Sequence, residues 1–204
     1  MDDPLKLIFD TLYSSTNGYK LSVAARSKLS HVNKAHTYGE VTYEGFKQML
    51  ALAKPKENDV FYDLGSGTGK PVFLASLFAP FKKLVGVEVI DSLHEASLNV
   101  LTQYENMILH NPSIITYRPH ISFIRDDFKK VDFSDADIIY MNATCFDFEL
   151  ANMPFVKKIE NLKVGTRIIT NSLPILSAYY TSDNIGQFKF SWGYTTVFLQ
   201  EKYR

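Results

Sequence analysis

The most informative stretch of this chain is Asp63-Leu64-Gly65-Ser66-Gly67-Thr68-Gly69. It follows a short apolar run, Val60 to Leu64, that is typical of a buried strand. It precedes Pro71 to Phe78, a predicted helix with proline near its first turn, where proline is tolerated. A glycine-rich turn between a strand and a helix lets the backbone approach a ligand, and the start of the helix points free N–H groups at it. The stretch therefore predicts a ligand site.

The spacing within this turn limits the class of ligand. Glycines stand at 65, 67 and 69 and are followed by Lys70, so neither the GxGxxG dinucleotide fingerprint nor the GxxxxGK[ST] phosphate loop is present. Asp63 directly before the turn suits an ammonium group better than a pyrophosphate. Glu88, nineteen residues after Gly69 at the end of the next predicted strand, is placed to accept both hydroxyls of a ribose. We therefore expect a cationic ligand with an amino acid moiety and a ribose.

Outward from the turn, strand and helix patterns alternate. Further strands are expected over 84–89, 121–125, 136–141, 167–171, 188–192 and 195–200, and further helices over 4–13, 21–29, 41–54, 91–109 and 152–162. Gly193-Tyr194 separates the last two strands at hairpin spacing, and residues 30–38 are expected to form a loop. The pattern predicts an α/β fold, a mostly parallel sheet with helices on both faces and a C-terminal antiparallel hairpin.

Composition excludes several classes of protein. The 204 residues hold 22 basic and 22 acidic side chains, which argues against strong nucleic-acid binding by the domain itself. The single cysteine, Cys145, and five histidines without ligand spacing argue against a disulfide framework and a metal site. The acidic amino terminus argues against a signal peptide, and the absence of a long apolar run argues against a membrane span. We therefore expect an intracellular protein, cytoplasmic or nuclear.

Charge is nevertheless unevenly distributed. Residues 126–149 hold seven acidic side chains against Lys129 and Lys130. Two interpretations are open. This is either ordinary surface scatter or an acidic rim that attracts a basic substrate.

Asp63, the glycine turn and Glu88 together resemble the S-adenosylmethionine site of class I methyltransferases. In that family an acid after the third strand accepts from the adenine amino group and an apolar ring packs on the base, which the resemblance assigns to Asp127 and Phe128. The fold it implies is Rossmann-like.

Seven short motifs in order narrow this resemblance. They are Tyr38-Gly39-Glu40, Asp63 to Gly69, Gly86-Val87-Glu88, Arg125 to Phe128, Asn142 to Phe146, Gly165 to Ile169 and Ser191-Trp192. The set resembles the Dot1-like, non-SET lysine methyltransferases and covers the chain from about His36 to its end. It implies a single methyltransferase domain over 1–204, with 1–37 a helical N-terminal extension or substrate lid and 38–204 the catalytic core.

The resemblance assigns a role to each matching residue. The implied cofactor-binding residues are Tyr38, Glu40, Asp63, Gly65, Gly67, Gly69, Lys70, Glu88, Asp127, Phe128 and Asn142. Asn142 also lies beside the transferring methyl group and Trp192 walls the lysine channel, so these two are the implied catalytic residues. Glu40 either contacts the cofactor or orders its loop.

The implied function is S-adenosylmethionine-dependent methylation of a lysine amine on a protein, with a histone as one substrate and no membrane partner. Two alternatives are open. One is a methyltransferase that acts on a small molecule or RNA, and the other is an inactive cofactor-binding partner module. The chain departs from the family at Lys70, where Gln is usual, and at Ala143 to Cys145, next to the substrate side.

Overall fold

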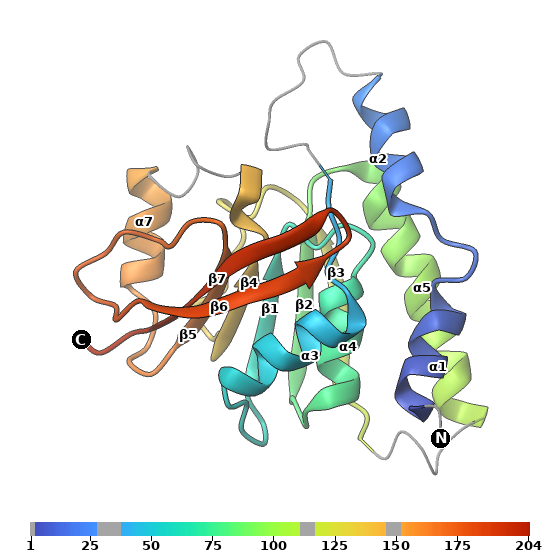
Figure 1. The fold of residues 1–204 in the computed structure, drawn as a ribbon, viewed down its shortest axis with the longest axis horizontal. Helices are drawn as coiled ribbons and strands as arrows, with labels where there is room; N and C mark the ends of the chain where they lie inside the picture. Colours follow the sequence, from blue (N-terminus) through green and yellow to red (C-terminus); the bar gives the residue numbers. More distant parts are fainter. Residues whose placement is uncertain (1–2, 28–37, 111–116, 146–151) are drawn as a thin grey trace.

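The chain folds around a seven-stranded sheet (Figure 1). The computed structural model describes residues 3–27, 38–110, 117–145 and 152–204. The strands are β1 (Val60–Leu64), β2 (Lys83–Glu88), β3 (His120–Arg125), β4 (Ile138–Met141), β5 (Arg167–Asn171), β6 (Asp183–Phe190) and β7 (Gly193–Glu201). Their order is β3-β2-β1-β4-β5-β7-β6, with β1 to β5 parallel and β7 antiparallel to both neighbours. The predicted fold class is confirmed.

Helices cover both faces of the sheet. They are α1 (Pro4–Leu12), α2 (Gly18–Arg26), α3 (Tyr43–Leu52), α4 (Lys70–Phe78), α5 (Asp91–His110) and α7 (Met153–Glu160), with a short 3-10 helix η2 (Ala143–Cys145). Alternate residues of β1 point to opposite faces, so Phe61 packs in the cluster that includes α3 and α4, and Tyr62 packs in the cluster that includes α7. Helices α1 and α2 pack against α5 in turn (Figure 1). In the ranges described, no helix is both long and apolar enough to span a membrane.

The strand order places a crevice at the carboxyl end of β1. β1 pairs with β2 on one side and with β4 on the other, and Asp63 lies opposite Gly86 and Tyr140 in these neighbours. The connection after β1 leads to β2 on one side, and the connection after β4 leads to β5 on the other side. The two connections therefore diverge at this point. Such a switch point is where open parallel sheets bind ligands.

Local signals explain where the helices begin. The side chain of Asp3 accepts a hydrogen bond from the Leu5 N–H, and that of Thr42 accepts one from the Gly45 N–H. The helix predicted over 41–54 begins only at Tyr43, because Val41 forms an antiparallel bridge with Phe190. The helix predicted over 21–29 instead begins at Gly18, after the cap Asn17, and residues 28 and 29 lie outside the described ranges. Most of the predicted 30–38 loop lies outside them too.

The C-terminal hairpin differs from its prediction in the position of the turn. β6 begins at Asp183 and ends at Phe190, which pairs with Gly193. Ser191 and Trp192 therefore form the turn, and Gly193, at φ +135°, begins β7. The left-handed backbone at Gly193 favours glycine and allows this two-residue connection. Trp192 consequently stands on a hairpin tip and not in a strand.

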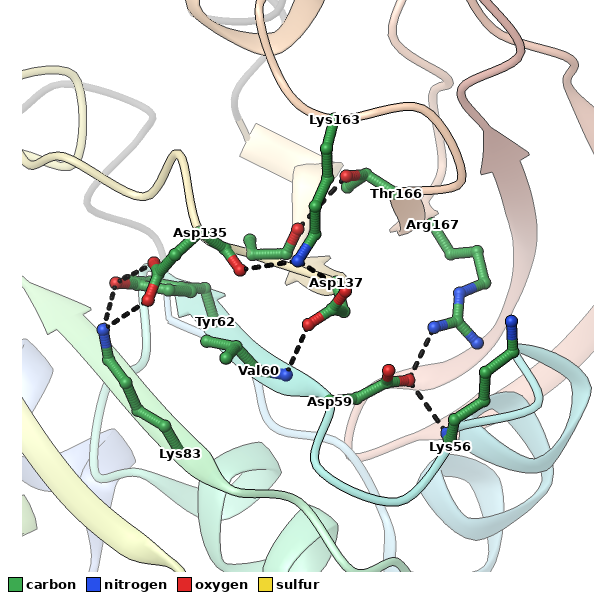
Figure 2. A network of polar contacts seen from close by, with 11 residues as sticks. Lys56, Asp59, Val60, Tyr62, Lys83, Asp135, Asp137, Lys163, Thr166 and Arg167 are labelled. Carbon is green, nitrogen blue, oxygen red and sulfur yellow. Dashed lines mark hydrogen bonds and ion pairs between the residues drawn. The ribbon is translucent and has the colours of Figure 1, made fainter.

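Buried charges connect the segments at the amino-terminal ends of the strands (Figure 2). Arg167 is 8% exposed and donates from Nη1 to the carbonyl oxygens of Ala53 at 2.7 Å and Lys54 at 2.6 Å. Its Nη2 pairs with Asp59 at 2.6 Å, and Asp59 also accepts from the Lys56 N–H at 2.8 Å. Arg167 thus ties β5 to the end of α3 and to the start of β1.

We expect Arg167→Ala to destabilise the fold by about 3–5 kcal/mol, because it leaves the Asp59 carboxylate buried without its cation. Chemical denaturation of the two proteins measures the difference. Lys163→Ala is the matched control: Lys163 pairs with Asp137 at 2.6 Å, but its side chain is 45% exposed, so the loss should stay within about 1 kcal/mol. Equal losses in the two variants would contradict the importance of the buried pair.

Candidate functional site

A cavity of about 660 Å³ opens at the carboxyl ends of β1, β2 and β4. Ten of the predicted site residues line it: Tyr38, Glu40, Gly65, Gly67, Lys70, Glu88, Asp127, Phe128, Asn142 and Trp192. Asp63 and Gly69, the other two predicted site residues, are not among the lining residues. In the described part of the chain, no group of three or more His, Cys, Asp or Glu side chains is arranged to hold a metal ion.

The glycine turn is held tightly against the end of β2. The N–H groups of Gly65 and Ser66 both donate to the Val87 carbonyl oxygen at 2.9 Å. Gly67 has φ +55°, and a Cβ at this position would lie 2.6 Å from the Tyr38 ring. Gly69 has φ +86° and would bring a Cβ to 2.7 Å from Phe123. Glycine is therefore required at these positions by backbone angle and by space.

Glu88 is buried beneath this turn at 7% exposure. Its Oε2 accepts from the Gly67 N–H at 2.8 Å and its Oε1 from the Ile90 N–H at 2.7 Å. Burial raises the pKa of this carboxyl, and backbone hydrogen bonds from Ile90, Gly67 and Val89 oppose the rise. A carboxylate offers about four lone-pair sites, so Glu88 keeps acceptor capacity for a hydroxyl group in the cavity.

Asp63 is buried more deeply, at 1% exposure, and neither of its carboxylate oxygens has a hydrogen-bond partner among the described residues. Burial raises its pKa well above the ordinary value, and the charge of Glu88 raises it further. A buried carboxylate without donors is costly, and a cationic N–H donor relieves that cost. The two acceptor oxygens of Asp63 therefore fit an ammonium group, which is a donor only.

An ion pair stands at the mouth of the turn. Lys70 Nζ lies 2.6 Å from Glu40 Oε2 and 4.9 Å from the centroid of the Tyr13 ring. The Tyr38 hydroxyl donates to Glu40 Oε1 at 2.6 Å. The Glu40 N–H also donates to Ser191 Oγ at 3.1 Å. Glu40 thus orders its loop and offsets the charge of Lys70.

Asp127 and Phe128 line another wall of the cavity, after β3. Asp127 Oδ1 accepts from the Lys129 N–H at 3.0 Å, and Oδ2 lies 3.4 Å from Lys129 Nζ. The Phe128 ring is 8% exposed and meets Phe155 of α7 edge-on, with centroids 5.3 Å apart. The pair presents an acceptor and an apolar surface side by side.

Asn142 and Trp192 approach each other across Gly39. Asn142 Nδ2 donates to the Gly39 carbonyl oxygen at 3.2 Å, and a Cβ on Gly39 would lie 2.2 Å from the Trp192 ring. Trp192 is 43% exposed and stacks on Phe190 with centroids 4.8 Å apart. Cys145 follows in η2, but its side chain and residues 146–151 lie outside the described part of the structure.

Four site residues have no counterpart in the sequence prediction. They are Tyr13, Tyr19, Tyr140 and Asn171. Asn171, at the end of β5, is fully buried and donates to Asn142 Oδ1 at 2.8 Å, which fixes the amide of Asn142. Asn171 could have been found from the sequence because it stands at the end of a strand, where parallel sheets bind ligands. The same holds for Tyr140, the penultimate residue of β4. Tyr13, at the end of α1, and Tyr19, in α2, also reach the site, but no sequence motif identifies them.

The sheet order and the crevice with its glycine turn define the fold of the class I, Rossmann-like methyltransferases. The structure is similar to that of TrmN from Thermus thermophilus, with a TM-score of 0.61 over 83% of this chain and 51% of that one, at 18% identity. A match to the model of the family described as "Histone methylation protein DOT1" extends over residues 19–189. The chain belongs to the DOT1 family, as the motif resemblance predicted.

Relatives by sequence carry related names. The chain is 29% identical over 161 residues to the Caenorhabditis elegans "Histone-lysine N-methyltransferase, H3 lysine-79 specific", covering 76% of this chain but 17% of that protein. It is 31% identical over 131 residues to the Saccharolobus islandicus "Protein-lysine N-methyltransferase", covering 63% of this chain and 71% of that protein. This chain therefore spans a small part of the worm relative and most of the archaeal one.

We expect Asp63→Asn to be more stable than the unsubstituted protein at pH 7 in the absence of ligand. The folded-state pKa of Asp63 is raised above its ordinary value of 3.8, so folding favours the protonated form and stability falls as the pH rises above about 4. The stability gap between the two proteins should therefore widen from pH 4 to pH 7. Thermal unfolding at several pH values measures it.

The exposed Asp183→Asn is the control and should leave the pH dependence unchanged. A gap that is constant with pH, or an Asp63→Asn protein that is less stable at pH 7, would contradict the unrelieved burial of this carboxylate.

Proposed function

We propose that this chain is an S-adenosylmethionine-dependent protein-lysine N-methyltransferase. The observation that carries the proposal is the buried Asp63 carboxylate, which has no hydrogen-bond partner among the described residues. It directly precedes the glycine turn, with Glu88 near it, in a chain of the DOT1 family. The cofactor has one ammonium group and one ribose. In this proposal Asp63 accepts from the ammonium group and Glu88 from the ribose.

The walls of the cavity suit the rest of the cofactor. Asp63, Gly65, Gly67, Gly69 and Lys70 hold its methionine end, with Lys70 facing the carboxylate. Glu88 accepts from the ribose hydroxyls, while Asp127 accepts from the adenine amino group and Phe128 packs on the base. Tyr38 and Glu40 close the turn from the other side through their mutual hydrogen bond.

The cofactor, when bound, supplies an electrophilic methyl group on a sulfonium. The role of the chain is to hold a neutral lysine amine in line with that group, in a site from which water is excluded. Asn142, fixed by Asn171 and Gly39, lies beside the reacting groups, and Trp192 walls the channel. Since Glu40 is paired with Lys70, its charge does little to hold the amine in the protonated form.

The substrate we propose is a lysine on a protein, and a histone is the first candidate. The names of the worm and archaeal relatives support a protein lysine in both cases, and that of the worm protein specifies histone H3. In this proposal residues 38–204 form the catalytic core and 1–37 an extension that reaches the cavity through Tyr19. A cytoplasmic or a nuclear protein substrate is equally compatible.

The test is incubation of the purified protein with methyl-labelled S-adenosylmethionine and three substrate pools: core histones, reconstituted nucleosomes and a total cell lysate. Label must be recovered as methyl-lysine. Transfer to any protein pool supports the activity, and the pool that is labelled identifies the substrate class. Cofactor binding by calorimetry without any methyl-lysine would contradict it in favour of a small-molecule or RNA substrate or an inactive module.

Glu88→Ala is expected to weaken cofactor binding by about 1–3 kcal/mol, because the ribose hydroxyls lose a charged acceptor. Calorimetry with S-adenosylhomocysteine measures the change. Glu201→Ala removes an exposed acid on β7 and should bind as the unsubstituted protein does. An unchanged dissociation constant for Glu88→Ala would remove Glu88 from the site.

Trp192→Ala is expected to preserve cofactor affinity and to lower kcat with the protein substrate, on the order of 10- to 100-fold, because the amine loses a wall of its channel. Steady-state methylation assays and calorimetry separate the two effects. Tyr203→Ala, which removes another exposed ring that does not line the cavity, is the control. A matching loss of cofactor affinity would assign Trp192 to the cofactor side instead.

A further inference from the structure

The hydroxyl of Tyr140 is buried in the wall of the cavity without a hydrogen-bond partner among the described residues. Tyr140 is 1% exposed, and its ring is fixed by an edge-on contact with Phe46 at 5.4 Å between centroids. The ring would pack equally well without its hydroxyl. A buried hydroxyl with no partner destabilises the protein, whereas phenylalanine would avoid that cost.

The other buried tyrosines of the described ranges differ from Tyr140 in this respect. The hydroxyl of Tyr104 accepts from Ser76 Oγ at 2.8 Å, and that of Tyr180 donates to the Ile159 carbonyl oxygen at 2.8 Å. Tyr43 and Tyr62 donate to aspartate carboxylates at 2.9 Å. Among the buried tyrosines of the described ranges, the unsatisfied hydroxyl therefore belongs to the one that lines the cavity.

The second unsatisfied group lies next to it. Asp63 and Tyr140 are register partners at the carboxyl ends of β1 and β4, so their side chains point to the same face of the sheet. Burial and the charge of Asp63 raise the pKa of Tyr140 well above its ordinary value, so its hydroxyl stays neutral. The two carboxylate oxygens of Asp63 and the hydroxyl of Tyr140 thus lack a partner among the described residues, at neighbouring positions of β1 and β4.

We propose that Tyr140 is a further cofactor-positioning residue, whose hydroxyl oxygen accepts a hydrogen bond from the ammonium group of the cofactor's methionine moiety while Asp63 accepts the others. An ammonium group has three N–H donors, and a carboxylate together with a phenol oxygen offers enough acceptors to use them. This inference rests on the proposed function, since it takes the cofactor to be S-adenosylmethionine.

Two ligands separate the contribution of this hydroxyl from that of the pocket as a whole. S-adenosylhomocysteine carries the amino acid moiety, whereas 5′-methylthioadenosine keeps the adenine, ribose and thioether and lacks the ammonium group. Tyr140→Phe is expected to bind S-adenosylhomocysteine about 3- to 10-fold more weakly and 5′-methylthioadenosine equally well. The variant should also unfold at the same or a higher temperature without ligand, yet gain less on adding S-adenosylhomocysteine.

Tyr104→Phe is the matched control, because it removes a buried hydroxyl that lies outside the cavity. It should bind both ligands as the unsubstituted protein does. Unchanged binding of S-adenosylhomocysteine by Tyr140→Phe, or an equal loss for both ligands, would overturn the inference and leave the proposed function standing. An unsubstituted protein that binds neither ligand would contradict the proposed function itself.

Discussion

The site depends on two carboxylates that the fold buries at the carboxyl ends of adjacent strands. Asp63 and Glu88 are 1% and 7% exposed, and burial raises the pKa of both carboxyls. The charge of Glu88 raises the pKa of Asp63 further. Glu88 is satisfied by backbone donors from the glycine turn and from the residues after β2. Asp63 accepts no hydrogen bond from any described residue. The same strand end that supports the glycine turn therefore buries a carboxylate that a cationic donor would stabilise.

The amino-terminal ends of the strands differ from this arrangement. The opposite edge of the sheet holds its own buried charge, but there Arg167 and Asp59 satisfy each other and the carbonyl groups around them. The buried pair at the amino-terminal ends of the strands is thus satisfied, whereas Asp63 and Tyr140 at the carboxyl ends have no partner among the described residues. This separation is common in enzymes, since groups that await a ligand are poor contributors to folding.

Much of this arrangement could be predicted from the sequence, because it is encoded locally. The strand, glycine turn and helix around Asp63 are adjacent in the chain, and the alternation of apolar segments predicted every strand of the sheet. What could not be predicted depends on contacts between distant segments. Examples are the bridge of Val41 to Phe190, which delays α3, and the hydrogen bond of Asn171 to Asn142. The sequence pattern predicts the hairpin turn at Gly193-Tyr194, but the structure has it two residues earlier, at Ser191-Trp192. The reason is that Gly193 belongs to β7 and not to the turn.

Helix α1 has a consequence for how this protein can be divided. Ile8 and Leu12 are buried in one cluster with Phe73 and Tyr104, and the Tyr13 hydroxyl donates to the Thr68 carbonyl oxygen of the glycine turn at 3.0 Å. A fragment that starts where the motif similarity starts, near residue 36, would expose this apolar surface and release the turn. A shortened version of this chain should therefore keep the first helix, since its removal is expected to yield an aggregating chain.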